Sequence, residues 1–462
     1  MTDLNTPIQP EELRDKIAHM WDVSGAKILS IEKSADRSKG APVYTVDGTY
    51  TARGWTDWTE GFQYGSAILQ FDATGDREYL EIGRRNTVAH MAAHVTHFGV
   101  HDHGFNNVST YGNLLRLLLE GRIDGSDWER NFYQLALKCS GAVQAARWTP
   151  LSDGGFVHSF NGAHSLFADT MRSMRVLVAA HVLGHELKGE QDESVSLLHR
   201  TVQHMQTTAR YTVYYGEGRD GYDVAGRVAH ESIFNTASGA YRCPSTQQGY
   251  SPFTTWTRAA AWIICGYAEE LECFLDLDFI SLEQMGGRDN IVDMMLRAAR
   301  VSADYFIEES GSCGVPYWDT GAPGLRDLGD WKSRPADPFN DFEPVDSSAA
   351  AIAAQGFLRL SRVEARLGNA ERSSRYATAG LRTLDTLLSE PYLSSDPGHQ
   401  GLLLHAEYHW PNRWDHVPDG HKVACGEATM WGDYHLREAC LYVQRILNNQ
   451  PYLAFYKIAD AG

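Results

Sequence analysis

The sequence lacks any run of 18 apolar residues, the length that a membrane-spanning helix requires. Its first 20 residues contain no apolar signal segment. It also lacks a CxxC pair, and its seven cysteines are an odd number. This cysteine usage is typical of a reduced, intracellular protein. We therefore expect a cytoplasmic protein without a membrane partner.

Positive charge is scarce. The chain has 41 Lys and Arg against 59 Asp and Glu, which gives a net charge of −18. Because nucleic-acid binding depends on a basic surface, nucleic acid is not an expected partner. An anionic small substrate would need a local basic pocket, because the negative net charge of the protein as a whole repels it.

Several catalytic motifs are missing as well. There is no GxSxG elbow, no Walker-type glycine-rich loop and no HExxH zinc motif. A histidine-rich segment, with His90, His94, His97, His101 and His103, contains pairs at helical i,i+4 spacing, and this could place metal ligands on one face. It offers no complete ligand set, so we expect neither a metal nor another cofactor.

Helical periodicity dominates what is present. Six segments have the amphipathic pattern of a helix with one solvated, charged face. Six further segments alternate with them and are poorer in charge and richer in Gly and Ala, as suits helices that are buried on most sides. The first set is 10–24, 76–95, 127–148, 191–211, 288–309 and 369–390; the second is 59–75, 107–121, 169–184, 257–271, 347–363 and 431–447.

This alternation predicts an all-α fold, an (α/α)6 toroid that forms a single domain over residues 1–462. No Pro/Gly/Ser-rich linker divides the chain. The segments 213–256 and 310–345 lack helical periodicity, so we expect long loops there, with short strands. Loops of that length in a compact domain are usually functional.

Each predicted inner helix opens with a residue of chemical interest. These residues are Trp58, Asp102, Asp169, Arg258, Asp346 and Asp433. A closed ring would bring the six helix starts to one end, where helix N-termini favour an anionic ligand. Each aspartate could instead be a simple N-cap, and we assign Asp346 and Asp433 to that role. Asp102 and Asp169 open successive inner helices and could form a carboxylate pair of the kind used in glycoside chemistry.

Seven segments, in order along the chain, resemble motifs of the unsaturated glucuronyl hydrolases, glycoside hydrolase family 88. They are WTDWTEGFQYG, HDHGF, FADTMRSMRVL, AHESIFN, QGYSPFTTWTRAAAW, PVDSSAAAIAAQGFL and WGDYHLREA. The resemblance implies a hydrolase that removes a terminal 4,5-unsaturated glucuronyl residue from lyase-generated oligosaccharides. It would do so by hydrating the C4=C5 double bond, so the expected partner is a uronic-acid-containing oligosaccharide.

The resemblance also implies roles for individual residues. Asp169 would be the proton donor and therefore protonated near neutral pH, and Asp102 would orient the sugar and tune Asp169. The substrate-contacting residues would be Trp58, His230, Arg258, Trp262, Phe160 and Tyr250. Phe160 is the nearest aromatic residue where other members carry a tryptophan, so the pocket wall beside the acid is altered. His101 and His103 are expected to hydrogen-bond locally.

Several different functions stay open at this point. An exo-β-glucuronidase would act on saturated glucuronic acid, and the altered wall at Phe160 is compatible with it. An epimerase of the same fold would need a histidine pair, and a polysaccharide lyase could use His230 and Tyr250. A non-catalytic sugar-binding toroid would be favoured if Asp102 and Asp169 lay on opposite faces. Arg258 could form an ion pair with a buried aspartate instead of binding substrate. The oligomeric state is not predicted.

Overall fold

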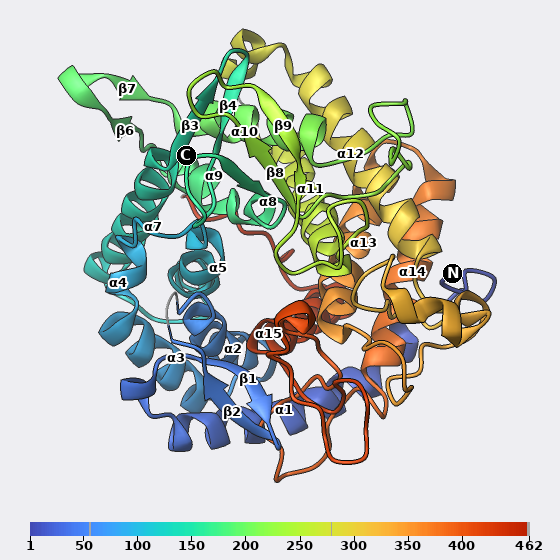
Figure 1. Cartoon of the computed structure of the whole chain (residues 1–462). Coiled ribbons are helices and arrows are strands. Elements are labelled where there is room, and N and C mark those ends of the chain that lie inside the picture. Colours follow the sequence, from blue (N-terminus) through green and yellow to red (C-terminus); the bar gives the residue numbers. More distant parts are fainter. Residues whose placement is uncertain (55–56, 279, 460–462) are drawn as a thin grey trace.

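The computed structural model describes residues 1–54, 57–278 and 280–459. Its helices form two concentric rings (Figure 1). The inner ring consists of α2 (Glu60–Thr74), α5 with α6 (His103–Asn107 and Asn113–Leu119), α8 with α9 (Thr170–Ser173 and Arg175–Val182), α11 (Thr257–Asp276), α13 (Ser347–Arg366) and α15 (Met430–Leu447). Each inner unit contacts the next, and α15 contacts α2 again, which closes the ring. The predicted (α/α)6 toroid is confirmed.

The outer ring alternates with the inner one along the chain. Its helices are α1 (Arg14–Ser34), α3 (Arg77–His90) followed by the short α4 (Ala92–Val95), α7 (Asp127–Ala146), α10 (Leu197–Tyr211), α12 (Arg288–Glu308) and α14 (Ala370–Leu387). Burial explains the two compositions. Nearly every residue of α11 and α13 is buried, whereas α14 buries only one side. A helix buried all round needs partners for the charges it carries, as when Glu269 and Glu272 of α11 meet Arg172 and Arg359 of its neighbours. A helix at the surface needs a polar face instead.

Two inner helices are interrupted where the sequence predicts continuous ones. Between α5 and α6 the chain makes a π-helical turn, η3 (Val108–Gly112). Side chains at this turn bond to backbone carbonyls: Thr110 Oγ1 donates to Asn106 O at 2.7 Å, and Asn113 Nδ2 donates to Ser109 O at 2.9 Å. These bonds satisfy carbonyls that the irregular turn leaves available. The other interruption, at Met174, separates α8 from α9.

Short strands occur in the connections between the helices. Three hairpins are formed by β1 (Pro42–Val46) with β2 (Thr49–Ala52), β3 (Trp148–Leu151) with β4 (Gly154–Val157), and β6 (Leu187–Lys188) with β7 (Ser194–Val195). A three-stranded antiparallel sheet has the order β5 (Ser165–Phe167), β8 (Glu231–Phe234), β9 (Tyr241–Ser245). Strands β8 and β9 are the strands expected within 213–256. The segment 310–345, which is described throughout, contains no strand but two short 3₁₀ turns, η6 (Pro323–Leu328) and η7 (Trp331–Ser333), and isolated β-bridges at Tyr317 and Asp319.

Glycines allow neighbouring inner helices to approach closely at the end where they begin. A Cβ atom on Gly61 of α2 would overlap the backbone of Asn106. A Cβ atom on Gly104 of α5 would overlap the backbone of Ser173. No side chain can be accommodated at either position, so these glycines set the spacing of α2, α5 and α8. Within the described ranges, no helix combines the length and the apolarity needed to cross a bilayer.

Candidate active site

A cavity of about 390 Å³ lies where four inner helices begin. Its wall includes Trp58, Asp102, Asp169 and Arg258, four of the six residues predicted to open inner helices. The described lining residues are Val43, Arg53, Gly54, Asp57, Trp58, His101, Asp102, Phe160, Asp169, Gln247, Gln248, Trp256, Arg258, Trp262, Tyr408, His409, Asn412 and Trp414. Six of the eight predicted site residues are therefore in the wall, and His230 and Tyr250 are not. Trp55 and Thr56, the first two residues of the WTDWTEGFQYG motif, lie outside the described residues.

The small sheet positions Asp169. Strand β5 pairs with β8 through Phe167 and Glu231, and the pairing is extended by a hydrogen bond from Ala168 N to His230 O at 2.9 Å. Asp169 follows directly, at the start of α8. Asp102 stands at the start of α5, which is held against α8 by the close approach of Gly104. The sheet and the helix contact thus bring both carboxylates to one cavity.

The aspartates at the helix starts differ in whether they act as caps. Neither Asp102 nor Asp169 caps its helix with its side chain. Asp346 does cap α13, as predicted, because it accepts hydrogen bonds from Ser348 N and Ala349 N. The prediction for Asp433 is wrong: Thr429 caps α15, and Asp433 accepts hydrogen bonds from the backbone of the preceding loop and from Tyr50.

His101 lies between the two aspartates. Its Nε2 is 3.4 Å from Asp169 Oδ1 and 3.9 Å from Asp102 Oδ1. Burial raises the pKa of Asp102, while the charge of His101 opposes that rise. Burial would also raise the pKa of Asp169, but the charge of the neighbouring His101 outweighs it and holds this pKa below its ordinary value. Burial would lower the pKa of His101, yet the two carboxylates raise it.

The pKa of Asp169 and the position of His101 each contradict a prediction from the sequence. The resemblance predicts a raised pKa for Asp169, which is instead the aspartate that His101 keeps ionised. The sequence predicts only local hydrogen bonds for His101, which instead faces both carboxylates. The sequence cannot reveal this arrangement, because adjacency of His101 and Asp102 in the chain does not fix which way either side chain points.

Arg258 lines the cavity, but its guanidinium is already engaged. Its Nη1 is 2.6 Å from Asp346 Oδ2 and 3.1 Å from Glu407 Oε2. Nη1 also donates to the carbonyl oxygen of Glu407, and Nη2 donates to that of Tyr408. All three side chains are almost completely buried, and burial raises the pKa of Glu407 to about 8, so Asp346 is the carboxylate that balances Arg258 at pH 7. The ion pair with a buried aspartate is therefore present, and Arg258 has little charge to spare for a uronate.

Removal of Arg258 should consequently destabilise the fold. Arg258→Met would leave the Asp346 carboxylate buried without its cation, and we expect a loss of about 3–5 kcal/mol in the free energy of unfolding, measured by urea denaturation. Arg366→Met, which breaks a surface pair with Asp276, is the matched control and should cost less than about 1 kcal/mol. Wild-type stability of Arg258→Met would show that the ion pair is not structural.

His230 and Tyr250 do not lie in the described wall. His230 is buried between the rings of Phe167 and Trp256, at centroid distances of 4.7 and 4.6 Å, and its Nδ1 accepts a hydrogen bond from Gln247 N. Burial lowers the pKa of His230 to about 4, so it is neutral at pH 7 and cannot supply a positive charge to the substrate. Tyr250 is half exposed, and its backbone N–H donates to Asp319.

Aromatic rings form much of the apolar wall. Trp58 stacks on Trp431 at a centroid distance of 4.8 Å and remains partly exposed to the cavity. Trp262 is almost fully buried and packs on Phe105 at 4.9 Å, so it belongs to the core as much as to the wall. Phe160 stacks on His101 at 5.9 Å. The residue that departs from the family pattern therefore contacts the histidine between the aspartates.

Part of the wall comes from segments in which the sequence predicts no site residue. Tyr408, His409, Asn412 and Trp414 belong to the loop between α14 and α15, and Arg53 follows β2. The only sequence signal for this loop is its aromatic-rich stretch HAEYHWPNRW, which lacks helical periodicity. Three more lining residues lie in the segment 213–256, which is predicted to be a functional loop: Gln247, Gln248 and Trp256.

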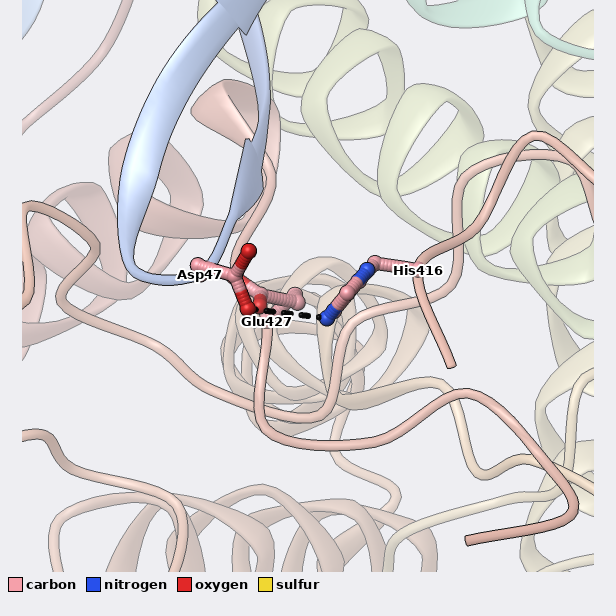
Figure 2. A group of neighbouring side chains, drawn as sticks. All are labelled: Asp47, His416 and Glu427. Carbon is pink, nitrogen blue, oxygen red and sulfur yellow. Dashed lines mark ion pairs between the residues drawn. The ribbon is translucent and has the colours of Figure 1, made fainter. Parts of the chain in front are cut away.

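One group of three described side chains could hold a cation, and it is not in the histidine-rich segment. It consists of Asp47, His416 and Glu427, whose ligand atoms lie within 4.8 Å of one another. Figure 2 shows Asp47, at the β1–β2 turn, pointing toward His416, with Nε2 3.2 Å from Oδ1. Glu427 already accepts a hydrogen bond from Gly48 N and lies 3.6 Å from His399 Nε2. Ion pairing accounts for these contacts without a metal.

We expect activity to be independent of metals, since carboxylates, an imidazole and water suffice for the chemistry of this site. Prolonged dialysis against EDTA should leave the rate of substrate turnover unchanged. A reproducible loss that zinc or manganese restores would contradict this expectation. Asp47→Asn would then test whether the group in Figure 2 is responsible.

Comparison with known proteins gives one consistent result. No protein-family model matches the chain. It is 25% identical over 445 residues to the unsaturated glucuronyl hydrolase of Bacillus sp. GL1, covering 92% of this chain and 97% of that one. It is 23% identical to the unsaturated chondroitin disaccharide hydrolase of Streptococcus agalactiae, covering 86% and 84%. The crystal structure of the Bacillus enzyme superposes with a TM-score of 0.67, covering 93% of this chain and 96% of that one at 23% identity. The resemblance that the motifs predicted is confirmed: over most of its length, the chain is similar to unsaturated glucuronyl hydrolases.

Proposed function

We propose that the chain is a glycoside hydrolase that removes a terminal 4,5-unsaturated glucuronyl residue from oligosaccharides generated by a polysaccharide lyase. The observation that carries the proposal is the meeting of Asp102 and Asp169 at one aromatic-walled cavity, joined through His101. The relatives named for this activity support the same choice.

The proposed chemistry is hydration of a vinyl ether. Asp169 delivers a proton to C4 and then accepts a proton from the water that adds to C5, so the substrate gains one water molecule. The product is an unstable hemiketal that opens and releases the remaining sugar. Asp102 orients the ring hydroxyls. General acid–base catalysis requires the proton donor to lie within hydrogen-bonding reach of the reacting atom, and Asp169 is in the cavity wall.

In the proposed complex, aromatic side chains stack on the sugar rings and one arginine binds the uronate carboxylate. Trp58, Trp262 and Phe160 provide apolar ring faces. Among the described lining residues, Arg53 is the arginine that no carboxylate pairs: its Nη2 donates to the carbonyl oxygen of Trp414. We therefore assign the uronate carboxylate to Arg53, in place of Arg258 and His230.

The second candidate is an exo-β-glucuronidase. The position of the two carboxylates is compatible with it, because both lie within 4 Å of one imidazole nitrogen and therefore close to each other. Glycosidases that displace at C1 use carboxyl groups about 5–9 Å apart. A lyase reaction gains no support, because His230 and Tyr250 do not meet in the described wall. A non-catalytic toroid is not favoured either, because the two aspartates lie at one cavity rather than on opposite faces.

The remaining assignments stay part of the proposal. The partner is a uronic-acid-containing oligosaccharide, without nucleic acid or membrane, and the chain works as one domain. All seven cysteines are free thiols, which supports a cytoplasmic location.

A substrate screen tests the proposal. Unsaturated disaccharides prepared with lyases should lose their ultraviolet absorbance in the presence of the protein, whereas saturated β-glucuronides should stay intact. Cleavage of saturated glucuronides alone would favour the exo-β-glucuronidase. Binding without cleavage of either class would favour the sugar-binding toroid.

A further inference from the structure

His101 is buried, with 1% of its surface exposed, and its ring has few partners besides the two aspartates. Both ring nitrogens and Asp169 Oδ1 lack a well-formed hydrogen bond among the described residues. Buried polar atoms in proteins are normally paired, so such a group needs an explanation. The nearest acidic atoms to Nε2 are those of Asp169 at 3.4 Å and Asp102 at 3.9 Å.

The position of this ring is fixed from two sides. The backbone carbonyl of His101 accepts hydrogen bonds from Gln144 Nε2 at 2.8 Å and from Ser173 Oγ at 2.6 Å. The ring stacks on Phe160 and meets Phe167 edge-on at a centroid distance of 5.5 Å. His101 is thus held where a small motion of the Asp169 side chain would complete a hydrogen bond.

The surroundings make His101 the cation that balances this carboxylate pair. The charged or titratable groups that act on it are Asp102, Asp169, Arg147, His158, His204 and His230. Burial lowers the pKa of His158 and His230 to about 4 and that of His204 to about 3, so all three are neutral at pH 7. The guanidinium of Arg147 donates to the carbonyl oxygens of Phe98, His158 and Ser159. Two buried carboxylates cannot both ionise without a nearby positive charge.

We propose that His101 is a positioning residue that stores, on Nε2, the proton that Asp169 delivers to the substrate. The inference rests on the proposed function. In the free protein, His101 is an imidazolium and Asp169 a carboxylate. The Nε2 proton moves to Asp169 Oδ1, and Asp169 passes it to C4. Asp169 then takes a proton from the water whose oxygen bonds to C5 and returns it to Nε2. The histidine and the aspartate end the cycle unchanged, and the substrate has gained H₂O.

This storage explains how an aspartate that is ionised in the free protein can act as an acid. It also gives a chemical role to the buried imidazole that precedes Asp102 in the HDHGF motif. Replacing His101 should affect the chemical step more than binding, because its ring lies in the cavity wall with only 1% of its surface exposed and faces the two aspartates.

His101→Gln tests the proposal. We expect kcat at pH 7.5 to fall by about 100-fold with little change in KM. The alkaline limb of the pH–kcat profile should move to lower pH, because the donated proton must then reside on the carboxylates alone. His103→Gln is the matched control: His103 is equally buried but bonds to Ser140 and to the carbonyl oxygen of His97, so its pH profile should keep the wild-type shape. A wild-type kcat and pH profile for His101→Gln would overturn the proposal.

A second measurement does not depend on turnover or on the folding of His101→Gln. Histidine-labelled protein, titrated by NMR, should show one buried imidazole that stays protonated above pH 6.5 in the wild type and loses its proton at lower pH in Asp169→Asn. Absence of such a resonance overturns the proposal. If the resonance is present but no unsaturated uronide is hydrolysed, then the proposed function fails while the charge pairing of His101 stands.

Discussion

Asp169→Asn is expected to abolish hydrolysis of unsaturated uronides, with kcat reduced by at least about 1000-fold. The amide has nearly the shape of the carboxyl group, but it cannot carry a transferable proton to C4 or accept one from water. The loss of ultraviolet absorbance at the C4=C5 bond gives the rate directly. Because Asp169 does not cap α8, its replacement by Asn removes no cap hydrogen bond from that helix.

The controls for Asp169→Asn separate chemistry from folding. Asp102→Asn should cost less, because the proposed role of Asp102 is to orient the sugar and tune Asp169. Asp153→Asn makes the same change at an exposed turn between β3 and β4, and it should leave the rate unchanged. Circular dichroism and thermal melting must match the wild type. A wild-type rate for a folded Asp169→Asn would remove Asp169 from the mechanism.

Burial is the reason why so much of the fold can be predicted. Helices α11 and α13 are enclosed on nearly every side, and their first turns, TRAAAW and SSAAAIAA, are accordingly rich in alanine. Helix α14 faces solvent and carries a charged stripe. Alternation between these two compositions has a period of one helical hairpin, and that period defines the toroid.

The interruptions and the hairpins depend on contacts that one-dimensional patterns do not contain. Periodicity predicts that α7 reaches Trp148, but the helix ends at Ala146, and Trp148 begins β3, where it pairs with Val157. The helix predicted from residue 191 begins at Leu197, where Ser196 provides the cap. The β1–β2 turn uses positive φ angles at residues 47 and 48, an Asp-Gly pair that favours a tight hairpin. That signal is present in the sequence but lies outside the helical pattern.

The candidate site shows the same division. Aspartates at helix starts can be located by counting, and Asp102 and Asp169 do lie in one wall. Counting helix starts does not show whether a charged side chain binds substrate or is already paired within the protein. Arg258 looks like a ligand for an acid until Asp346 and Glu407 are found beside it. His101 looks like a local hydrogen-bonding residue until Asp169 is found 3.4 Å away. Pairing in space, rather than position in sequence, decides which charge is available.

The nature of the bond attacked should have the largest effect on substrate choice. If hydration is the chemistry, a saturated β-glucuronide has no vinyl ether to protonate, and its turnover should be below detection while the unsaturated analogue is consumed. The wall at Phe160, which stacks on His101, is where this chain departs from the family pattern, so the comparison bears directly on its own site. Matched disaccharides that differ only in the C4=C5 bond are the appropriate pair.

Heavy-oxygen water distinguishes the two routes by the position of the label. Hydration places the label at C5, in the open-chain keto product before exchange, because water adds to that carbon. Direct displacement places it at C1 of an intact uronic acid. Mass spectrometry of the early product should therefore locate the label at C5. Rapid cleavage of the saturated glucuronide with the label at C1 would contradict hydration; the toroid and the paired aspartates would then serve an exo-β-glucuronidase, with the carboxylates acting across C1 instead of across the double bond.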